Sequence, residues 1–371
     1  MSVGHCHPRV LAAVRAQQER LQHTTTIYLH PEVALYASEL AAKLPPGLDT
    51  LYFVNSGTEA NDLALLMARA YTGAYDVLAL RHAYHGGGGA PYGATAHATW
   101  RHAVPAGDGI RHVLCPDAYR GAFGGDGARY AADLGEAIAT STPGRIAAFI
   151  HESILGVGGA IPLADGFLAP AYASVRAAGG VCVADEVQTG FGRTGSHYWG
   201  FEAHGVVPDM VTMAKGIGNG LPLGAVATTR EIAAALATRL HFNTFGGNPV
   251  CAAGGRAVLA AVEADGCQEN ARRVGGMVET GLRELAAKYS IIGDVRGAGL
   301  MLGVDFVSDR GTKNAAPAEA AAVMEALKDA GILIGKGGLA GNVLRVKPPM
   351  CWSEGDAAFF LEAFGGALKA L

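Results

Sequence analysis

A lysine and an aspartate each follow a short hydrophobic run, and their positions suit carbonyl chemistry. Asp185 follows the run Val181 to Ala184, and Lys215 follows the run Met210 to Ala214. Runs of this kind are typical of buried strands in a parallel sheet, and ligands bind at the carboxyl ends of such strands. A lysine held at a poorly solvated strand end is suited to Schiff-base formation with a carbonyl compound.

The combination of this lysine with an acid suggests a pyridoxal-phosphate (PLP) enzyme. A carboxylate beside the pyridine nitrogen of PLP keeps that nitrogen protonated, through a charge-assisted hydrogen bond of about 1.5–3 kcal/mol. The protonated ring can then accept electrons from a substrate carbanion. Gln188 lies three residues after Asp185, within reach of the phenolic oxygen of such a ring.

A phosphate site is expected where the segment NSGTEAND joins a strand to a helix. Ser56 and Glu59 fit the S-x-x-E capping box, so a helix begins near Gly57. The free N–H groups of a helix N-terminus bind anions, and a glycine permits close approach of the ligand. A capped helix alone is more often structural, but the presence of Lys215 favours phosphate binding by Gly57 and Thr58.

Strands and helices alternate through the first two thirds of the chain, which indicates an α/β fold. Such alternation predicts a mostly parallel sheet covered on both faces. Strands are expected at residues 51–55, 77–80, 146–150, 181–185 and 210–214, and helices at 9–22, 32–44 and from about 57. The pattern changes near residue 275, where a smaller α+β domain is expected, with helices at 277–289, 317–331 and from 354, and strands within 291–306 and at 343–347.

Composition limits the classes of partner. The chain has 371 residues, half of them hydrophobic and 17% charged, with a formal net charge of −4. It contains no long run of like charge and no apolar stretch of membrane-spanning length, so neither nucleic acid nor a membrane is an expected partner. The N-terminus MSVGHCHPRV has no signal pattern, which predicts a cytoplasmic protein. His5, Cys6 and His7 lack a second ligand cluster, so no metal site is expected.

The assembled motifs resemble the class III, ornithine-aminotransferase-like group of PLP-dependent enzymes, and within it the alanine–glyoxylate aminotransferase 2 type. The resemblance extends over nearly the whole chain, through GHCHP, FVNSGTEAND, AYHG, ADEVQTGFGRTG, MAKGIGNG, HFNTFGGNP, GDVRGAGLMLG and LRVKPPMC. It implies the PLP-dependent transferase fold type I, with an N-terminal segment (1–22) that belongs to the small domain, a large PLP-binding domain (23–262) and a C-terminal small domain (263–371). It also implies a homodimer.

The resemblance assigns a role to individual residues of this chain. Lys215 would carry the Schiff base, Asp185 would contact the ring nitrogen, and Arg345 would bind a substrate carboxylate. Thr244 would reach the phosphate in the neighbouring subunit. The other expected cofactor contacts are Ser56, Gly57 and Thr58 at the phosphate, Tyr84 stacked on the ring with His85 beside it, Gln188 at the phenolic oxygen, and Glu152 of the family's E-P-x-x-G stretch. Here that stretch is HESILGVGG, with Ser153 and Leu155 in place of the usual proline and glutamine.

These roles predict a ping-pong aminotransferase that moves an amino group from alanine, β-alanine or 3-aminoisobutyrate to glyoxylate or pyruvate. HTTTIYLH, HESILGVGG and KPPMC also resemble phospho-lyases that act on phosphoethanolamine or phosphohydroxylysine, which leaves a lyase as the alternative. Arg345 favours the transferase, because a guanidinium suits bidentate capture of a carboxylate. A non-catalytic role is disfavoured, because the lysine, the aspartate and the phosphate loop are all present.

Overall fold

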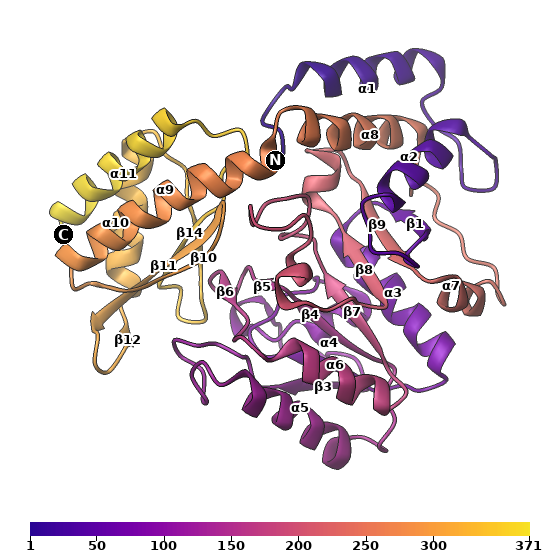
Figure 1. The fold of residues 1–371 in the computed structure, drawn as a ribbon, viewed down its shortest axis with the longest axis horizontal. Helices are drawn as coiled ribbons and strands as arrows, with labels where there is room; N and C mark the ends of the chain where they lie inside the picture. The colour runs from indigo at the N-terminus through magenta and orange to yellow at the C-terminus, as the bar shows by residue number, and fades with distance from the viewer.

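The computed structural model describes residues 1–371, and its main feature is a seven-stranded sheet enclosed by helices (Figure 1). Every strand but β9 runs in the same direction, because β9 pairs antiparallel with both of its neighbours. In spatial order the strands are β1 (Thr50–Val54), β9 (Gly224–Thr228), β8 (Met210–Met213), β7 (Val181–Asp185), β4 (Ala148–Glu152), β2 (Val77–Leu80) and β3 (Ile110–Val113).

Alternating side chains of each strand enter two separate hydrophobic cores, which explains why the strands appear as continuous apolar runs. In β2, Val77 and Ala79 face one core, and Leu78 and Leu80 face the other. The first core is covered by α3 (Gly57–Thr72), α4 (Gly89–Ala94) and α7 (Arg230–Leu236). The second is covered by α2 (Pro31–Ala41), α5 (Gly127–Ser141), α6 (Leu168–Ala177) and part of α8 (Pro249–Ala264).

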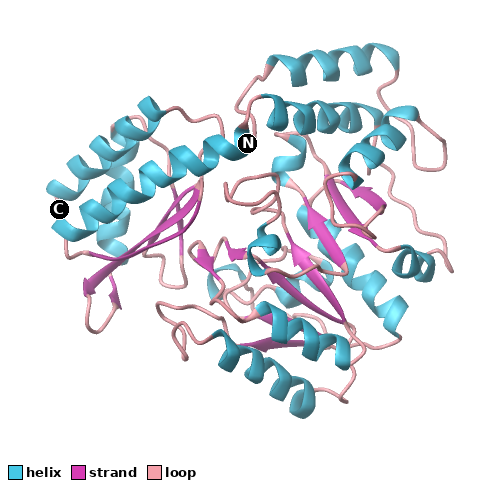
Figure 2. Ribbon diagram, in the orientation of Figure 1, coloured by secondary structure: helices cyan, strands magenta, loops and turns pink.

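The C-terminal third forms a smaller antiparallel sheet with helices on one face (Figure 2). Its strands are β10 (Ile292–Ala298), β11 (Met301–Asp309), β14 (Val343–Val346) and β13 (Gly335–Gly337), with β12 (Asn314–Ala315) paired to β11. The helices are α9 (Cys267–Lys288), α10 (Pro317–Asp329) and α11 (Glu354–Lys369). Leu344 and Val346 of β14 enter this core, so Arg345 lies on the opposite face, toward the large sheet.

Asp305 on β11 connects the two lobes and is fully buried. It accepts two hydrogen bonds from Arg120, a residue of the large lobe: one from Nε (3.1 Å) and one from Nη2 (2.6 Å). Arg296 Nη1 (3.0 Å) and Asn342 Nδ2 (2.8 Å) of the small lobe complete its shell. This network fixes the position of the small sheet, and therefore of Arg345, relative to the large sheet.

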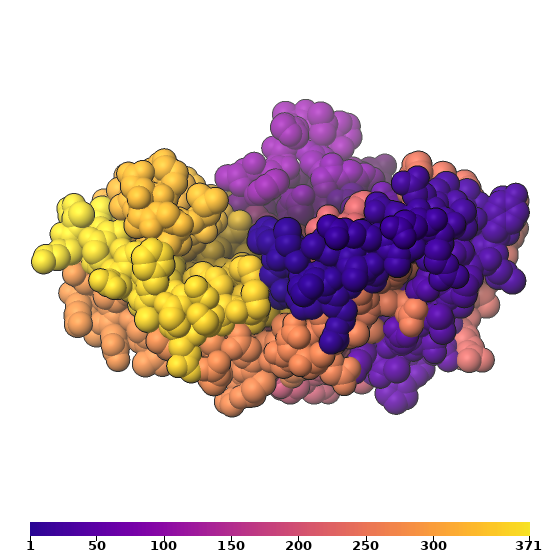
Figure 3. Space-filling view, turned by 90° about the horizontal axis from the view of Figure 1, so that it is seen from above, coloured from indigo at the N-terminus to yellow at the C-terminus, as the bar shows by residue number.

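The N-terminal residues lie across both lobes. Helix α1 (Pro8–Arg20) packs along α8, and the space-filling view shows this indigo segment above the orange helix and beside the yellow C-terminal region (Figure 3). Asn219 Oδ1 accepts hydrogen bonds from the N–H groups of Ser2 (2.7 Å) and Val3 (3.1 Å), and Met350 N–H donates to the Ser2 carbonyl (3.0 Å). The domain limits expected at residues 22 and 262 remain predictions.

Most expected elements occur with bounds close to those predicted. The strands at 77–80 and 181–185 have the predicted ends, whereas the strand expected at 146–150 occupies Ala148–Glu152. Short elements complete the chain: β5 (Ile154–Leu155), β6 (Ile161–Pro162), η1 (Ala98–Trp100), η2 (Gly200–His204) and η3 (Lys215–Gly218). No helix combines the length and the apolar character needed to cross a membrane.

Candidate active site

A cavity of about 240 Å³ opens where β1, β4, β7 and β8 end. Because these strands are parallel, their carboxyl ends meet at one edge of the sheet. Nine of the eleven predicted site residues line this cavity: Ser56, Gly57, Thr58, Tyr84, His85, Glu152, Asp185, Gln188 and Lys215. The lysine and the aspartate that follow separate strands are thus neighbours in space.

Asp185 is held by three hydrogen-bond donors and is only 4% exposed. Its Oδ2 accepts from Asn61 Nδ2 (2.7 Å) and His85 Nδ1 (2.8 Å), and its Oδ1 accepts from the Val187 N–H (3.1 Å). Asn61 is itself oriented by Thr212, whose Oγ1 donates to Asn61 Oδ1 (2.6 Å). These bonds fix the orientation of the Asp185 carboxyl group.

The N-terminus of α3 forms one wall of the cavity. Ser56 caps the helix by accepting from the Glu59 N–H (3.2 Å), as the sequence predicts. The reciprocal bond differs from the prediction, because Glu59 Oε2 accepts from the N–H of Asn55 (2.9 Å) and not from that of Ser56. The first N–H groups of a helix have no partner within it, which leaves those of Gly57 and Thr58 available to a ligand.

The loop after Tyr84 packs closely against this helix terminus. A Cβ atom on Gly86 would lie 2.7 Å from Thr58 Oγ1, and Gly86 has φ +143°, so only glycine fits this position. Thr95 Oγ1 accepts from the N–H groups of His85 (3.0 Å) and Gly86 (3.2 Å) and donates to the Gly86 carbonyl (2.9 Å). Gly86 is thus held by specific bonds, and the run of glycines that follows leads into α4.

Lys215 has an unusual backbone for a residue with a side chain, with φ +48°. Such left-handed conformations cost on the order of 1 kcal/mol and occur often at functional sites. The residues that follow are fixed, because Ser2 Oγ donates to the Gly216 carbonyl (3.0 Å) and Asn219 Nδ2 donates to the Gly4 carbonyl (2.9 Å). The N-terminal segment therefore helps to hold the lysine loop in place.

Glu152, at the end of β4, accepts two backbone N–H groups. Tyr84 N–H donates to Oε1 (3.0 Å) and Gly156 N–H donates to Oε2 (2.8 Å), while burial raises the pKa of this carboxyl group. Gly156 also packs against Gln188, since a Cβ atom at Gly156 would lie 2.2 Å from Gln188 Nε2. Glu152 thus fixes the backbone that supports Gln188.

The two unusual residues beside Glu152 have structural partners. Ser153 Oγ donates to Glu186 Oε1 (2.6 Å), and Thr189 Oγ1 (2.7 Å) and two backbone N–H groups complete the shell of this buried acid. Burial raises the pKa of Glu186. Leu155 is fully buried in the second core of the large lobe. Neither residue lines the cavity, so any effect of Ser153 and Leu155 on the cavity is indirect and depends on how they pack around it.

Thr244 and Arg345 lie outside the cavity. Thr244 is exposed on the loop between α7 and α8. The same loop is held at the α3 terminus, because Asn243 forms hydrogen bonds with Asn55 and Glu59. Arg345 projects from β14 toward the site, and its Nη1 donates to the Gly156 carbonyl (3.2 Å). It lines a second cavity, of about 510 Å³.

Three residues of the site were missed from the sequence. Asn61 lies four residues after Gly57, a spacing that places both on one helix face. Lys347 lies two residues after Arg345, on the same side of an extended chain. Its Nζ donates to Gln188 Oε1, and burial together with the positive charges of Arg345 and Lys215 lowers its pKa to about 7. No sequence pattern marks Thr212, on β8, as a residue of the site.

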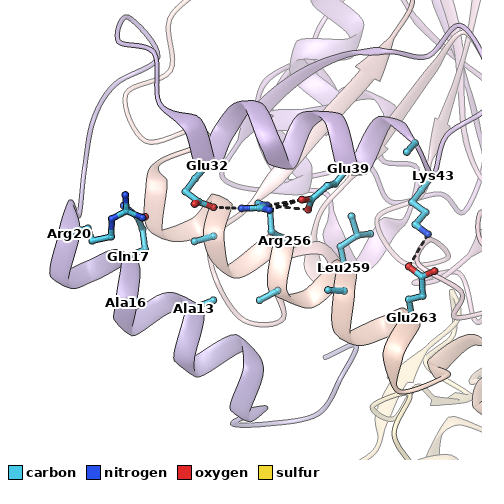
Figure 4. A pocket seen from close by; sticks show the side chains of 14 residues that line it. Ala13, Ala16, Gln17, Arg20, Glu32, Glu39, Lys43, Arg256, Leu259 and Glu263 are labelled. Carbon is cyan, nitrogen blue, oxygen red and sulfur yellow. Dashed lines mark hydrogen bonds and ion pairs between the residues drawn. The ribbon is translucent and has the colours of Figure 1, made fainter.

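A larger cavity, of about 620 Å³, lies between α1, α2 and α8, away from these residues (Figure 4). All of its charged side chains except Arg20 pair with one another. Arg256 donates to Glu32 Oε2 (2.7 Å) and to both oxygens of Glu39, and Lys43 Nζ donates to Glu263 Oε2 (3.0 Å). Every acid that lines this groove is thus paired with Arg256 or Lys43, in contrast to the smaller cavity at Lys215.

Comparison with known proteins identifies the family of the chain. The family model described as Aminotransferase class-III matches residues 1–368. The chain is 53% identical to alanine–glyoxylate aminotransferase 2 homolog 2 of Arabidopsis thaliana over 371 residues, which cover 100% of this chain and 77% of the relative. It is 44% identical to human alanine–glyoxylate aminotransferase 2, with 99% of this chain and 76% of the relative covered.

Solved structures with the same fold include enzymes of two reaction types. A phospholyase from Arthrobacter in complex with phosphoethanolamine superposes with a TM-score of 0.92 at 34% identity, covering 99% of this chain and 88% of that one. An (S)-enantioselective omega-transaminase from Thermomicrobium roseum gives a TM-score of 0.91 at 33% identity, covering 100% and 86%.

One prediction is wrong. The expected cytoplasmic location is contradicted, because the relatives from Arabidopsis thaliana and human are both named as mitochondrial proteins. The first residues have no signal pattern, but this absence does not establish a cytoplasmic location. The family and the fold predicted from the motifs are confirmed: the chain belongs to the class III aminotransferases, which are PLP-dependent enzymes of fold type I.

Proposed function

We propose that the chain is an aminotransferase that moves an amino group from alanine, β-alanine or a similar amine to glyoxylate or pyruvate by a ping-pong mechanism. The observation that carries this proposal is the convergence of Lys215 and Asp185 with the α3 terminus in one cavity. The two relatives named alanine–glyoxylate aminotransferase 2 support the choice of alanine and glyoxylate.

The cavity has the donors and acceptors that PLP requires. The α3 terminus, with Ser56, Gly57 and Thr58, suits the phosphate, and Asp185 suits a protonated ring nitrogen. Tyr84 has its ring 5.0 Å from that of Trp100, an edge contact that steadies it as a stacking surface. Bound PLP would supply an aldehyde that takes up an amino group and a ring that accepts the electrons of the breaking C–H bond.

The protein's own groups perform the positioning and the proton transfers. Lys215 would hold the cofactor covalently, and its amine is the group suited to move a proton from the substrate carbon as a general base. Asp185 would keep the ring nitrogen of bound PLP protonated, and Asn61 and His85 hold Asp185 in place. His85 therefore acts behind the carboxylate, as a positioning residue.

Arg345 is proposed to bind the substrate carboxylate. Only its Nη1 makes a hydrogen bond in the chain, and its Nε is buried without a partner. A guanidinium with free donors suits bidentate binding of a carboxylate. Because Arg345 lies on β14, a carboxylate bound to it would lie on the small-lobe side of the cavity.

We also propose a homodimer in which Thr244 completes the neighbouring subunit's phosphate site. Thr244 does not line the cavity of its own chain, and its loop exposes Leu240, Phe242 and Phe245. A second loop exposes Ile27, Tyr28 and Leu29, and His23 contacts the Phe245 ring at 5.2 Å. Large exposed apolar side chains that gather on adjoining loops are typical of an interface.

Steady-state kinetics tests the proposal. With alanine and glyoxylate varied together, a ping-pong enzyme gives parallel double-reciprocal lines, and intersecting lines contradict the mechanism. The alternative, a phospho-lyase, is tested in the same preparation by measuring inorganic phosphate released from phosphoethanolamine. Release of phosphate without turnover of alanine would replace the transferase with the lyase.

A further inference from the structure

Arg193 lies in the loop that follows β7 and is buried, yet none of the ion pairs of the chain includes it. Burial lowers its pKa only to about 10, so the guanidinium is charged at neutral pH. Its Nη1 donates to the carbonyls of Leu300 (2.9 Å) and Pro348 (2.9 Å), and its Nη2 donates to the carbonyl of Met1 (3.2 Å). A buried charge is costly unless it is hydrogen-bonded, so these bonds offset the burial of the cation.

Two of these three carbonyls belong to the small lobe. Leu300 lies in the turn between β10 and β11, and its N–H donates back to the Arg193 carbonyl (3.1 Å). The turn packs closely against the loop, because a Cβ atom on Gly299 would lie 2.6 Å from the Arg193 carbonyl oxygen. Pro348 follows β14, three residues after Arg345. Arg193 therefore holds the small lobe at two points, and one of them is next to the strand that carries Arg345.

The segment after β14 depends on this contact because it has few backbone donors of its own. Pro348 and Pro349 have no N–H group, so neither donates a backbone hydrogen bond. The Pro348 carbonyl accepts from Arg193, and the next N–H along the chain, that of Met350, donates to the Ser2 carbonyl (3.0 Å). The end of β14 is thus held by a guanidinium of the large lobe and by the N-terminal segment.

We propose that Arg193 is a positioning residue that sets where the Arg345 guanidinium lies relative to Gln188 and the cofactor, and so determines how tightly a substrate carboxylate binds. This inference rests on the proposed function, in which Arg345 binds that carboxylate. Arg193 follows Gln188 by five residues, so one loop joins the cofactor contacts to the end of β14. The planar fork of a guanidinium fixes several acceptors at once, which a lysine ammonium does not do. A misplacement on the order of 1 Å at a substrate contact costs about 100-fold.

The test measures binding of propionate, an unreactive carboxylate, to the PLP-loaded protein through the change that it causes in the cofactor absorbance. Arg193→Met should weaken propionate binding by roughly 10- to 100-fold, while the affinity for PLP, measured by dialysis, stays within about threefold of the wild-type value. Arg193→Lys keeps the charge but not the fork, so it should weaken propionate binding by about fivefold or more, and it serves if the methionine variant does not fold. Arg272→Met, at an exposed arginine on α9 that pairs with Glu269, is the matched control and should change neither affinity.

A double-mutant cycle with Arg345→Met tests whether Arg193 acts through Arg345. If it does, Arg193→Met should weaken propionate binding by less than about threefold once Arg345→Met is present. The inference is overturned by an equal loss in both backgrounds, by wild-type binding in Arg193→Met or Arg193→Lys, or by a parallel loss of PLP affinity. Wild-type binding in Arg345→Met would instead contradict the proposed role of Arg345 and remove the inference with it, so the two failures are seen in different variants.

Discussion

Replacement of Asp185 by asparagine tests the most constrained contact in the site. Three donors converge on this carboxylate: Asn61 and His85 on Oδ2, and the Val187 N–H on Oδ1. Asparagine has one acceptor oxygen and one NH₂ group. If its oxygen replaces Oδ2, its NH₂ group faces the Val187 N–H; if its oxygen replaces Oδ1, its NH₂ group faces two donors.

Either orientation leaves at least one buried donor unsatisfied, which costs about 1–3 kcal/mol of stability. The variant also loses the charge that keeps the ring nitrogen protonated. A charge-assisted bond of about 1.5–3 kcal/mol that is lost from the transition state corresponds to a roughly 10- to 100-fold slower half-reaction. The ring also loses part of its capacity to accept electrons, which slows the half-reaction further. The rate can therefore fall by more than about 100-fold.

Urea denaturation of the cofactor-free protein measures the first effect, and stopped-flow absorbance with alanine measures the second. Glu186→Gln is the matched control, because this neighbouring acid is equally buried, accepts four donors and does not line the cavity. It should lose stability and keep its half-reaction rate per loaded site. An Asp185→Asn protein that reacts within twofold of the wild-type rate would refute the role of the carboxylate.

Three further predictions concern the lysines and the lobe contact. Lys215→Ala should abolish turnover and prevent covalent trapping of PLP by borohydride; measurable turnover with alanine would exclude Lys215 as the nucleophile. Asp305→Asn should lower the free energy of unfolding by about 3–5 kcal/mol, since it breaks a buried ion-pair network with Arg120 and Arg296; the exposed control Asp49→Asn should show no measurable change in urea denaturation. Lys347 has its pKa lowered from 10.5 to about 7 in the folded chain, so between these values the unfolded chain binds a proton that the folded chain does not. Stability of the wild type relative to Lys347→Met should therefore rise from pH 7 to pH 10, and a difference that is constant with pH would show that the lysine titrates normally.

The sequence predicted those parts of the fold that local patterns determine. The apolar runs at 77–80 and 181–185 identify β2 and β7 because both faces of these strands are buried. Ser56 and Glu59 identify the start of α3 because capping is a local interaction. Strand β9 was not predicted, because its short run GAVAT has no feature that reveals its antiparallel pairing between β1 and β8.

The site was predicted as a set of residues, but not as a network. Asp185 and Lys215 follow strands, so the parallel topology alone brings them together. The residues that hold the site residues in place depend on tertiary contacts. Thr212 donates to Asn61, and Ser153 donates to Glu186, and in both pairs the partners are far apart in the sequence. Lys347 was missed because its effect depends on the distance from β14 to Gln188, which only the packing of the two lobes sets.

The most direct test of the central claim is the absorption spectrum of the PLP-loaded protein before and after addition of alanine without an acceptor. If the chain is an alanine-using aminotransferase, the band of the lysine-bound cofactor should be replaced by that of pyridoxamine phosphate, with pyruvate released in equal amount. Addition of glyoxylate should restore the original band. A spectrum that alanine and β-alanine both leave unchanged, in a protein that binds PLP through Lys215, would contradict the claim.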